Sequence, residues 1–82
     1  MATSFTGKIN TNNTYQNVSE LTGVTFTSGK TYTMQVQNDA YLKIDNAEFL
    51  FSNEKFQYKA SGSDLYIKTT TMPCVLSILE EV

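Results

Sequence analysis

The chain is predicted to adopt an all-β fold, a small antiparallel β-sandwich or jelly-roll-like barrel of about seven to nine short strands. Two observations support this prediction. Apolar and polar side chains alternate with a period of two along most of residues 24–79, as in strands that bury one face. Clusters of Gly, Asn, Asp and Ser interrupt the alternation at intervals of about 8–12 residues, which is the strand spacing of sandwiches and small barrels.

The first part of the chain predicts one strand followed by an ambiguous segment. Residues 5–9 alternate and form the first expected strand, and the Asn-rich residues 10–14 form a polar turn. Residues 15–21 fit either a short strand or a single helical turn, which Gly23 ends.

The middle of the chain predicts one hairpin and two further strands. Residues 24–26 and 31–37 alternate on either side of a Ser-Gly-Lys turn. After a turn at Asn38 and Asp39, residues 40–45 alternate again. Residues 48–51 form a short apolar strand that could be buried on both faces, followed by a turn at residues 52–55.

The last part of the chain predicts three strands. Residues 56–59 alternate, residues 60–64 turn the chain, and residues 65–68 alternate once more. The β-branched residues 69–71 fit an edge strand, a strand that pairs between subunits, or a loop. Residues 74–79 form the final strand.

The length of 82 residues predicts a single domain, residues 1–82, with an extended N-terminal arm allowed at residues 1–4. The inward positions of the strands define the expected core. They are Phe26, Tyr32, Met34, Val36, Leu42, Ile44, Phe49, Phe51, Phe56, Leu65, Ile67 and Ile78.

The cysteine and histidine counts limit how so small a domain gains stability. One cysteine and no histidine leave neither an intrachain disulfide nor a zinc site. A partner chain, most simply a second copy, remains as a stabilising device, although domains of this size also fold alone. Cys74 has apolar neighbours and is expected to be a buried small hydrophobe, not a reactive thiol.

Composition argues against several functions. All six basic residues are lysines and the net charge is −2, which disfavours specific nucleic-acid recognition and a polybasic membrane anchor. The chain lacks histidine, the commonest general base, and its carboxylates fall mainly at expected turns and ends. The glycines are single, so no phosphate-binding loop is expected. We therefore expect no enzymatic activity and no catalytic, cofactor or metal site.

Two tyrosine–lysine pairs stand out on the outward register of the strands. Tyr41 and Lys43 alternate with inward residues of one strand, and Tyr66 and Lys68 repeat the pattern on another. Tyrosine is common at protein interfaces, so these four residues are a candidate partner-contact patch. The alternative is ordinary cross-strand pairing on a solvated sheet face.

Three features of the sequence carry a resemblance to a known class of proteins. They are the Thr- and Asn-rich short strands, the Ser-Gly-Lys-Thr-Tyr-Thr hairpin at residues 28–33 and the Leu-Tyr-Ile-Lys segment at residues 65–68. Over residues 24–78 the chain resembles small accessory proteins of tailed-bacteriophage virions, of the head-decoration or head-fibre type. The resemblance implies a β-sandwich or jelly-roll-like unit that adds to a larger shell, often as a trimer. No functional residue carries over, because no shared motif matches position by position.

The leading functional hypothesis is a virion accessory or decoration domain that self-associates or docks on a larger assembly. The alternative is a phage-encoded inhibitor of a host or defence enzyme, and a carbohydrate-binding module ranks third because the chain has no Trp. We expect a protein partner, no specific nucleic acid and no membrane. No apolar run has the length of a membrane-spanning helix and residues 1–8 carry no signal-peptide pattern, so the expected location is a virion or the host cytoplasm.

Overall fold

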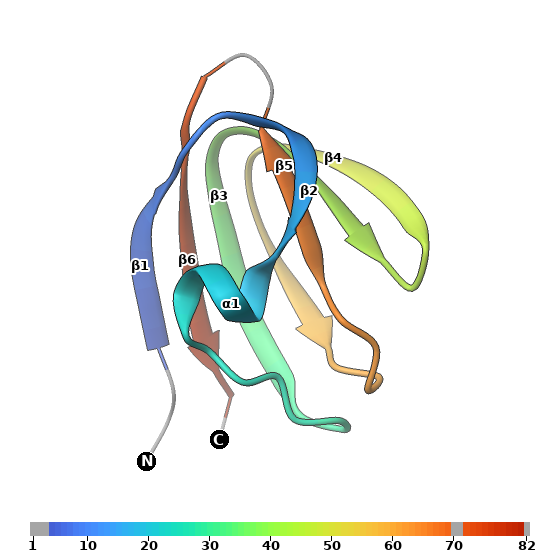
Figure 1. The fold of residues 1–82 in the computed structure, drawn as a ribbon. Helices are drawn as coiled ribbons and strands as arrows, with labels where there is room; N and C mark the ends of the chain where they lie inside the picture. Colours follow the sequence, from blue (N-terminus) through green and yellow to red (C-terminus); the bar gives the residue numbers. More distant parts are fainter. Residues whose placement is uncertain (1–3, 70–71, 82) are drawn as a thin grey trace.

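The computed structural model describes residues 4–69 and 72–81 of the chain, and most of them lie in strands (Figure 1). The all-β prediction is confirmed. The elements are β1 (Ser4–Ile9), β2 (Asn12–Asn17), α1 (Val18–Thr22), β3 (Thr31–Ile44), β4 (Ala47–Lys59), β5 (Tyr66–Thr69) and β6 (Cys74–Glu80).

All strands belong to one antiparallel sheet whose centre is β3. The strand order is β1-β6-β3-β5-β2, and β4 pairs with the other edge of β3. Along the edge opposite β4, β3 pairs first with β6 through residues 32–37 and then with β5 through residues 41–43. The first half of β3 therefore belongs with β1 and β6, and its second half with β2 and β5.

A β-bulge separates these two halves of the sheet. The turns predicted at Asn38–Asp39 and at residues 52–55 are wrong, because β3 and β4 continue through both positions. Two residues of β3, Gln37 and Asn38, stand opposite the single residue Asn53 of β4. Asn38 (φ 72°) and Asn53 (φ 51°) both adopt the left-handed conformation, which Asn tolerates better than most residues. The Asn38 N–H donates to Asn53 Oδ1 at 2.9 Å.

The β3–β4 hairpin bends over at this bulge, as Figure 1 shows at the top of the view. Asp45 and Asn46 form its tight turn, both at positive φ. The bend brings the two ends of β4 toward each other, since the Ser61 hydroxyl, just after β4, donates to Asp45 Oδ1, just before it, at 2.8 Å. The two halves of the curled sheet thus face each other across a shared core.

The prediction of seven to nine strands was too high, because four expected short strands are two long ones. Residues 24–26 also form no strand. Their loop is held instead by Tyr32, whose hydroxyl accepts from the Thr27 N–H at 2.7 Å and donates to the Thr25 carbonyl at 3.3 Å. The ambiguous residues 15–21 are divided between β2 and α1, which Asn17 caps by accepting from the Glu20 N–H.

Most of the predicted core is confirmed. The fully buried members are Tyr32, Met34, Val36, Leu42, Leu65, Ile67 and Ile78, and the half-buried members Phe26, Ile44, Phe51 and Phe56 pack against them. Phe49 is 48% exposed, so its assignment to the core is wrong. The prediction omitted Ile9, Val18, Val24, Ala40, Tyr58, Ala60 and Leu76.

Cys74 is buried, as predicted, with 1% of its surface exposed. Burial raises the pKa of its thiol. The proposed arm at residues 1–4 falls outside the described residues except for Ser4, which begins β1, and of residues 69–71 only Thr69 is described, at the end of β5. In the described part of the chain, no helix combines the length and the apolar character that crossing a membrane requires.

Candidate functional site

The four residues of the predicted patch lie together on the outward face of β3 and β5. Tyr41 stands directly opposite Lys68, and Lys43 directly opposite Tyr66. Between these two pairs, Leu42 and Ile67 are paired and buried on the inner face. The two tyrosine–lysine pairs are therefore neighbours on one surface, an arrangement that depends on the β3–β5 pairing.

Strands β4 and β2 extend this surface on both sides. On β4, Leu50 stands opposite Tyr41 and Glu48 opposite Lys43. On β2, the ring of Tyr15 lies close to the lysines of the patch. We call this surface the tyrosine–lysine face, and it consists of Tyr15, Tyr41, Lys43, Glu48, Leu50, Tyr66 and Lys68.

Tyr15 connects the members of the tyrosine–lysine face. The Lys68 Nζ lies 4.7 Å from the centre of the Tyr15 ring and 5.4 Å from that of Tyr41. The Lys43 Nζ lies 5.7 Å from the Tyr15 ring. Contacts of this kind between an ammonium group and an aromatic ring are worth about 0.5–1 kcal/mol at exposed sites. The Tyr15 hydroxyl donates a hydrogen bond to Glu48 Oε1 at 2.7 Å.

The environment of Tyr15 keeps its hydroxyl protonated. Burial, followed by the hydrogen bond to Glu48 and the negative charge of that carboxylate, raises the pKa of Tyr15 to about 12. Near neutral pH the phenol is therefore a hydrogen-bond donor that fixes Glu48 across from β2.

The tyrosine–lysine face combines exposed apolar area with positive charge. Tyr41 is 37% exposed and Leu50 is 54% exposed. Lys43 and Lys68 form no salt bridge with the described residues, and Glu48 is the only carboxylate that belongs to the face as defined. The face as defined therefore carries two positive charges and one negative charge, and Asp45 and Asp64 lie in the pocket that adjoins Lys43 and Tyr66.

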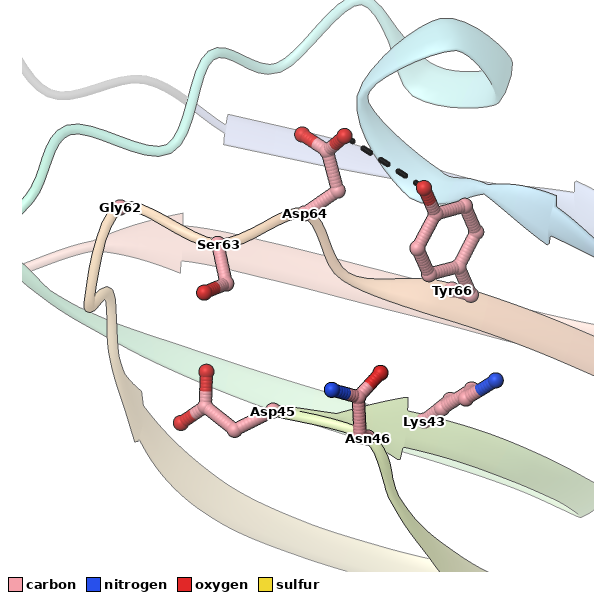
Figure 2. A pocket seen from close by; sticks show the side chains of 7 residues that line it. All are labelled: Lys43, Asp45, Asn46, Gly62, Ser63, Asp64 and Tyr66. Carbon is pink, nitrogen blue, oxygen red and sulfur yellow. Dashed lines mark hydrogen bonds between the residues drawn. The ribbon is translucent and has the colours of Figure 1, made fainter.

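A shallow polar pocket of about 360 Å³ lies beside Lys43 and Tyr66 (Figure 2). The turn after β3 and the segment before β5 form its two walls, as Figure 2 shows, and they supply Asp45, Asn46, Gly62, Ser63 and Asp64. The Tyr66 hydroxyl donates to Asp64 Oδ2 at 3.4 Å. The carboxylates of this pocket can accept further hydrogen bonds from polar groups.

A second hollow of about 400 Å³ lies on another side of Tyr66, where Tyr15, Gln16, Asn17, Glu20 and Leu21 complete its lining. Tyr66 therefore separates two depressions in the surface. Among the described residues, no three Asp, Glu or Cys side chains gather as a metal-binding group. The tyrosine–lysine face and the two depressions beside it present aromatic area, ammonium groups and hydrogen-bond acceptors.

Sequence reasoning missed Tyr15, Glu48 and Leu50 as members of this surface. Tyr15 lay in a segment whose secondary structure was ambiguous, and its strand pairs with one some fifty residues later in the chain. Glu48 and Leu50 belonged to an apolar run that fits burial on both faces. The part of the surface that the sequence did predict was found because Tyr41, Lys43, Tyr66 and Lys68 alternate with inward apolar side chains.

Comparisons with protein-family models, with curated proteins and with solved structures found no match to this chain.

Proposed function

We propose that this chain is a non-enzymatic interaction domain that docks on a protein partner through the tyrosine–lysine face. One observation carries the proposal: side chains of β2, β3, β4 and β5 gather three tyrosines, two lysines and an exposed leucine on one surface. Docking needs no cofactor and no metal ion.

The composition of the face suits an energetic centre of binding. Tyrosine supplies a large contact area through only two rotatable side-chain bonds, so little conformational entropy is lost when a partner covers it. Tyr15 and Tyr41 are further restrained by Lys68, which lies near both rings. A few residues of this kind dominate the affinity of most interfaces.

The charge of the face favours an acidic surface on the partner. Lys43 and Lys68 have no ion pair among the described residues, so carboxylates of a partner would form salt bridges with their ammonium groups. Such an interface associates faster at low ionic strength, because the two charged surfaces attract before contact.

The favoured partner is a larger viral assembly, in line with the resemblance to phage virion accessory proteins. In this proposal the curled sheet is the sandwich or jelly-roll-like unit that adds to the shell, and the protein acts in the virion or the host cytoplasm. The proposal includes no specific nucleic acid and no membrane.

The test compares a Tyr41→Ala/Tyr66→Ala variant with the unchanged protein. Tagged chains are expressed in the cells that naturally produce this protein, and the captured proteins are identified by mass spectrometry. Gln35→Ala/Gln57→Ala is the matched control, because these exposed residues lie on the outward face of the other half of the sheet. Thermal melting checks that all three proteins are folded.

We expect an abundant structural protein of a particle to be captured by the parent and the control, and lost with the tyrosine variant. Moderate salt should weaken the capture. Capture that is unaffected by the two tyrosine substitutions would contradict docking through this face. Capture of one host enzyme, with the same dependence on the tyrosines, would instead support the inhibitor function.

A further inference from the structure

The outer edge of β4 is open. Among the described residues, β4 pairs only with β3, along its whole length from Ala47 to Lys59. An edge strand of this length presents a row of backbone N–H and C=O groups that another strand can pair with. The opposite side of the curled sheet differs, because there α1 packs against β1 and β2.

An aromatic row lies along this open edge. Phe49, Phe51 and Phe56 of β4 point to the inner face, opposite Leu42, Ala40 and Met34 of β3. The rings of Phe51 and Phe56 are stacked with their centres 4.1 Å apart, and Phe49 follows at 6.5 Å from Phe51. Within residues 4–69 and 72–81 no strand covers the outer side of this row, and Phe49 remains 48% exposed.

We propose that a second copy of this chain pairs antiparallel with β4, edge to edge, through a two-fold axis at the bulge. The two sheets would become continuous and the two aromatic rows would adjoin. Main-chain hydrogen bonds would supply affinity, as in other cases of strand addition, and the phenylalanine side chains would supply buried apolar area.

The bulge determines which register is allowed. Before Asn53 the odd-numbered residues of β4 face the core, and after it the even-numbered residues do. Side chains on the same face must stand opposite each other in a pair of strands. The longest pairing that satisfies this condition sets the first half of one β4 beside the second half of the other.

This register sets opposite charges and aromatic side chains opposite each other. It places Glu48 of each copy opposite Lys59 of the other, both on the outward face, and because Glu48 Oε1 accepts from the Tyr15 hydroxyl, the pair with Lys59 would be made by Oε2. On the inner face it places Phe51 opposite Phe56 of the other copy. Shifting the register by two residues in either direction sets Leu50 opposite a lysine. Opposite charges and aromatic pairs across strands are stabilising, each by about 0.2–1 kcal/mol.

The test measures the mass of the native protein by sedimentation equilibrium, over a concentration series from micromolar to millimolar. Variants K59E, E48K and E48K/K59E are compared with K8E, a matched charge reversal at an exposed lysine of β1. We expect a dimer whose dissociation constant rises about tenfold in K59E, since two symmetry-related Glu–Lys pairs become like-charged. The double reversal should dimerise more tightly than either single reversal, although E48K also removes the acceptor of the Tyr15 hydroxyl, and K8E should leave the affinity unchanged.

A monomer mass at every concentration would overturn the proposal, and so would equal effects of K59E and K8E. Failure of the double reversal to dimerise more tightly than either single reversal would overturn the register. This inference does not depend on the proposed function: Tyr41→Ala/Tyr66→Ala should keep the dimer, and K59E should keep capture of the docking partner.

Discussion

Tyr15 shows how one side chain can organise a surface. Its ring lies beside the ammonium groups of Lys43 and Lys68, and its hydroxyl holds Glu48. These residues come from β3, β5 and β4, so one side chain of β2 contacts residues of three other strands. A surface fixed in this way loses less conformational freedom on binding than a surface of independent side chains.

We predict that Glu48→Gln lowers the pKa of Tyr15 from about 12 toward its ordinary value of 10.0 without reaching it, because burial is the largest cause of the shift. The pKa is raised in the folded state, so protonated Tyr15 stabilises the fold fully below pH 10.0, and this stabilisation is lost as the pH rises toward about 12. NMR of the tyrosine rings during a pH titration measures the pKa, with Glu54→Gln as control. An unchanged Tyr15 titration in Glu48→Gln would show that the negative charge of Glu48 contributes nothing, because the glutamine amide oxygen can still accept the hydrogen bond.

Cys74 should be inert in the native protein. It is buried and its thiol has a raised pKa, so little reactive thiolate forms near neutral pH. We expect a thiol reagent to label the protein only after denaturant is added, and Cys74→Ala to keep partner binding. Fast labelling without denaturant would mean that β6 opens readily.

At the scale of strands, alternation predicted correctly which face most side chains occupy. It failed where polar clusters act within strands, because Asn and Asp that commonly mark a turn also build a bulge. Asn38 and Asn53 could be assigned to one bulge only if the pairing of β3 with β4 were known. Phe49 failed for a related reason: its position on the inner face was right, but alternation says nothing about distance from an open edge.

The bulge itself can be tested at Asn53. Asn53→Val should lower the free energy of unfolding by about 1–3 kcal/mol, because a β-branched residue resists positive φ and the hydrogen bond from the Asn38 N–H is lost. Asn53→Asp keeps an acceptor oxygen and should cost much less. Urea unfolding of the two variants measures the difference, and equal stability would mean that the bulge adapts freely.

For the whole molecule, the sequence predicted the all-β class and most of the core, but not the strand order. The meeting of Tyr41 and Lys43 with Tyr66 and Lys68 follows from the β3–β5 pairing, which joins distant segments. Local patterns carry no direct information on such pairings. The curled sheet also closes one side of the core with α1 and leaves the β4 side open, a difference that appears only in three dimensions.

Two leucines of β6 differ in how far their side chains are buried. Leu76 is fully buried, whereas Leu79 is 49% exposed. We expect Leu76→Ala to cost about 2–5 kcal/mol, a large part of the stability of so small a domain, and Leu79→Ala to stay within about 0.5 kcal/mol of the parent. Thermal and urea unfolding compare them. Similar losses from both variants would contradict the placement of the core.

The bend at Asn38 and Asn53 has a consequence for a pair of chains joined along β4. Because the bend turns the inner faces of the two half-sheets toward each other, their outward faces look in opposite directions. The symmetric register sets the Glu48 half of one copy beside the Lys59 half of the other, so the two tyrosine–lysine faces lie on opposite sides of the pair. Such a dimer would have two binding faces that point away from each other. It would therefore bind two separate partner molecules and link them.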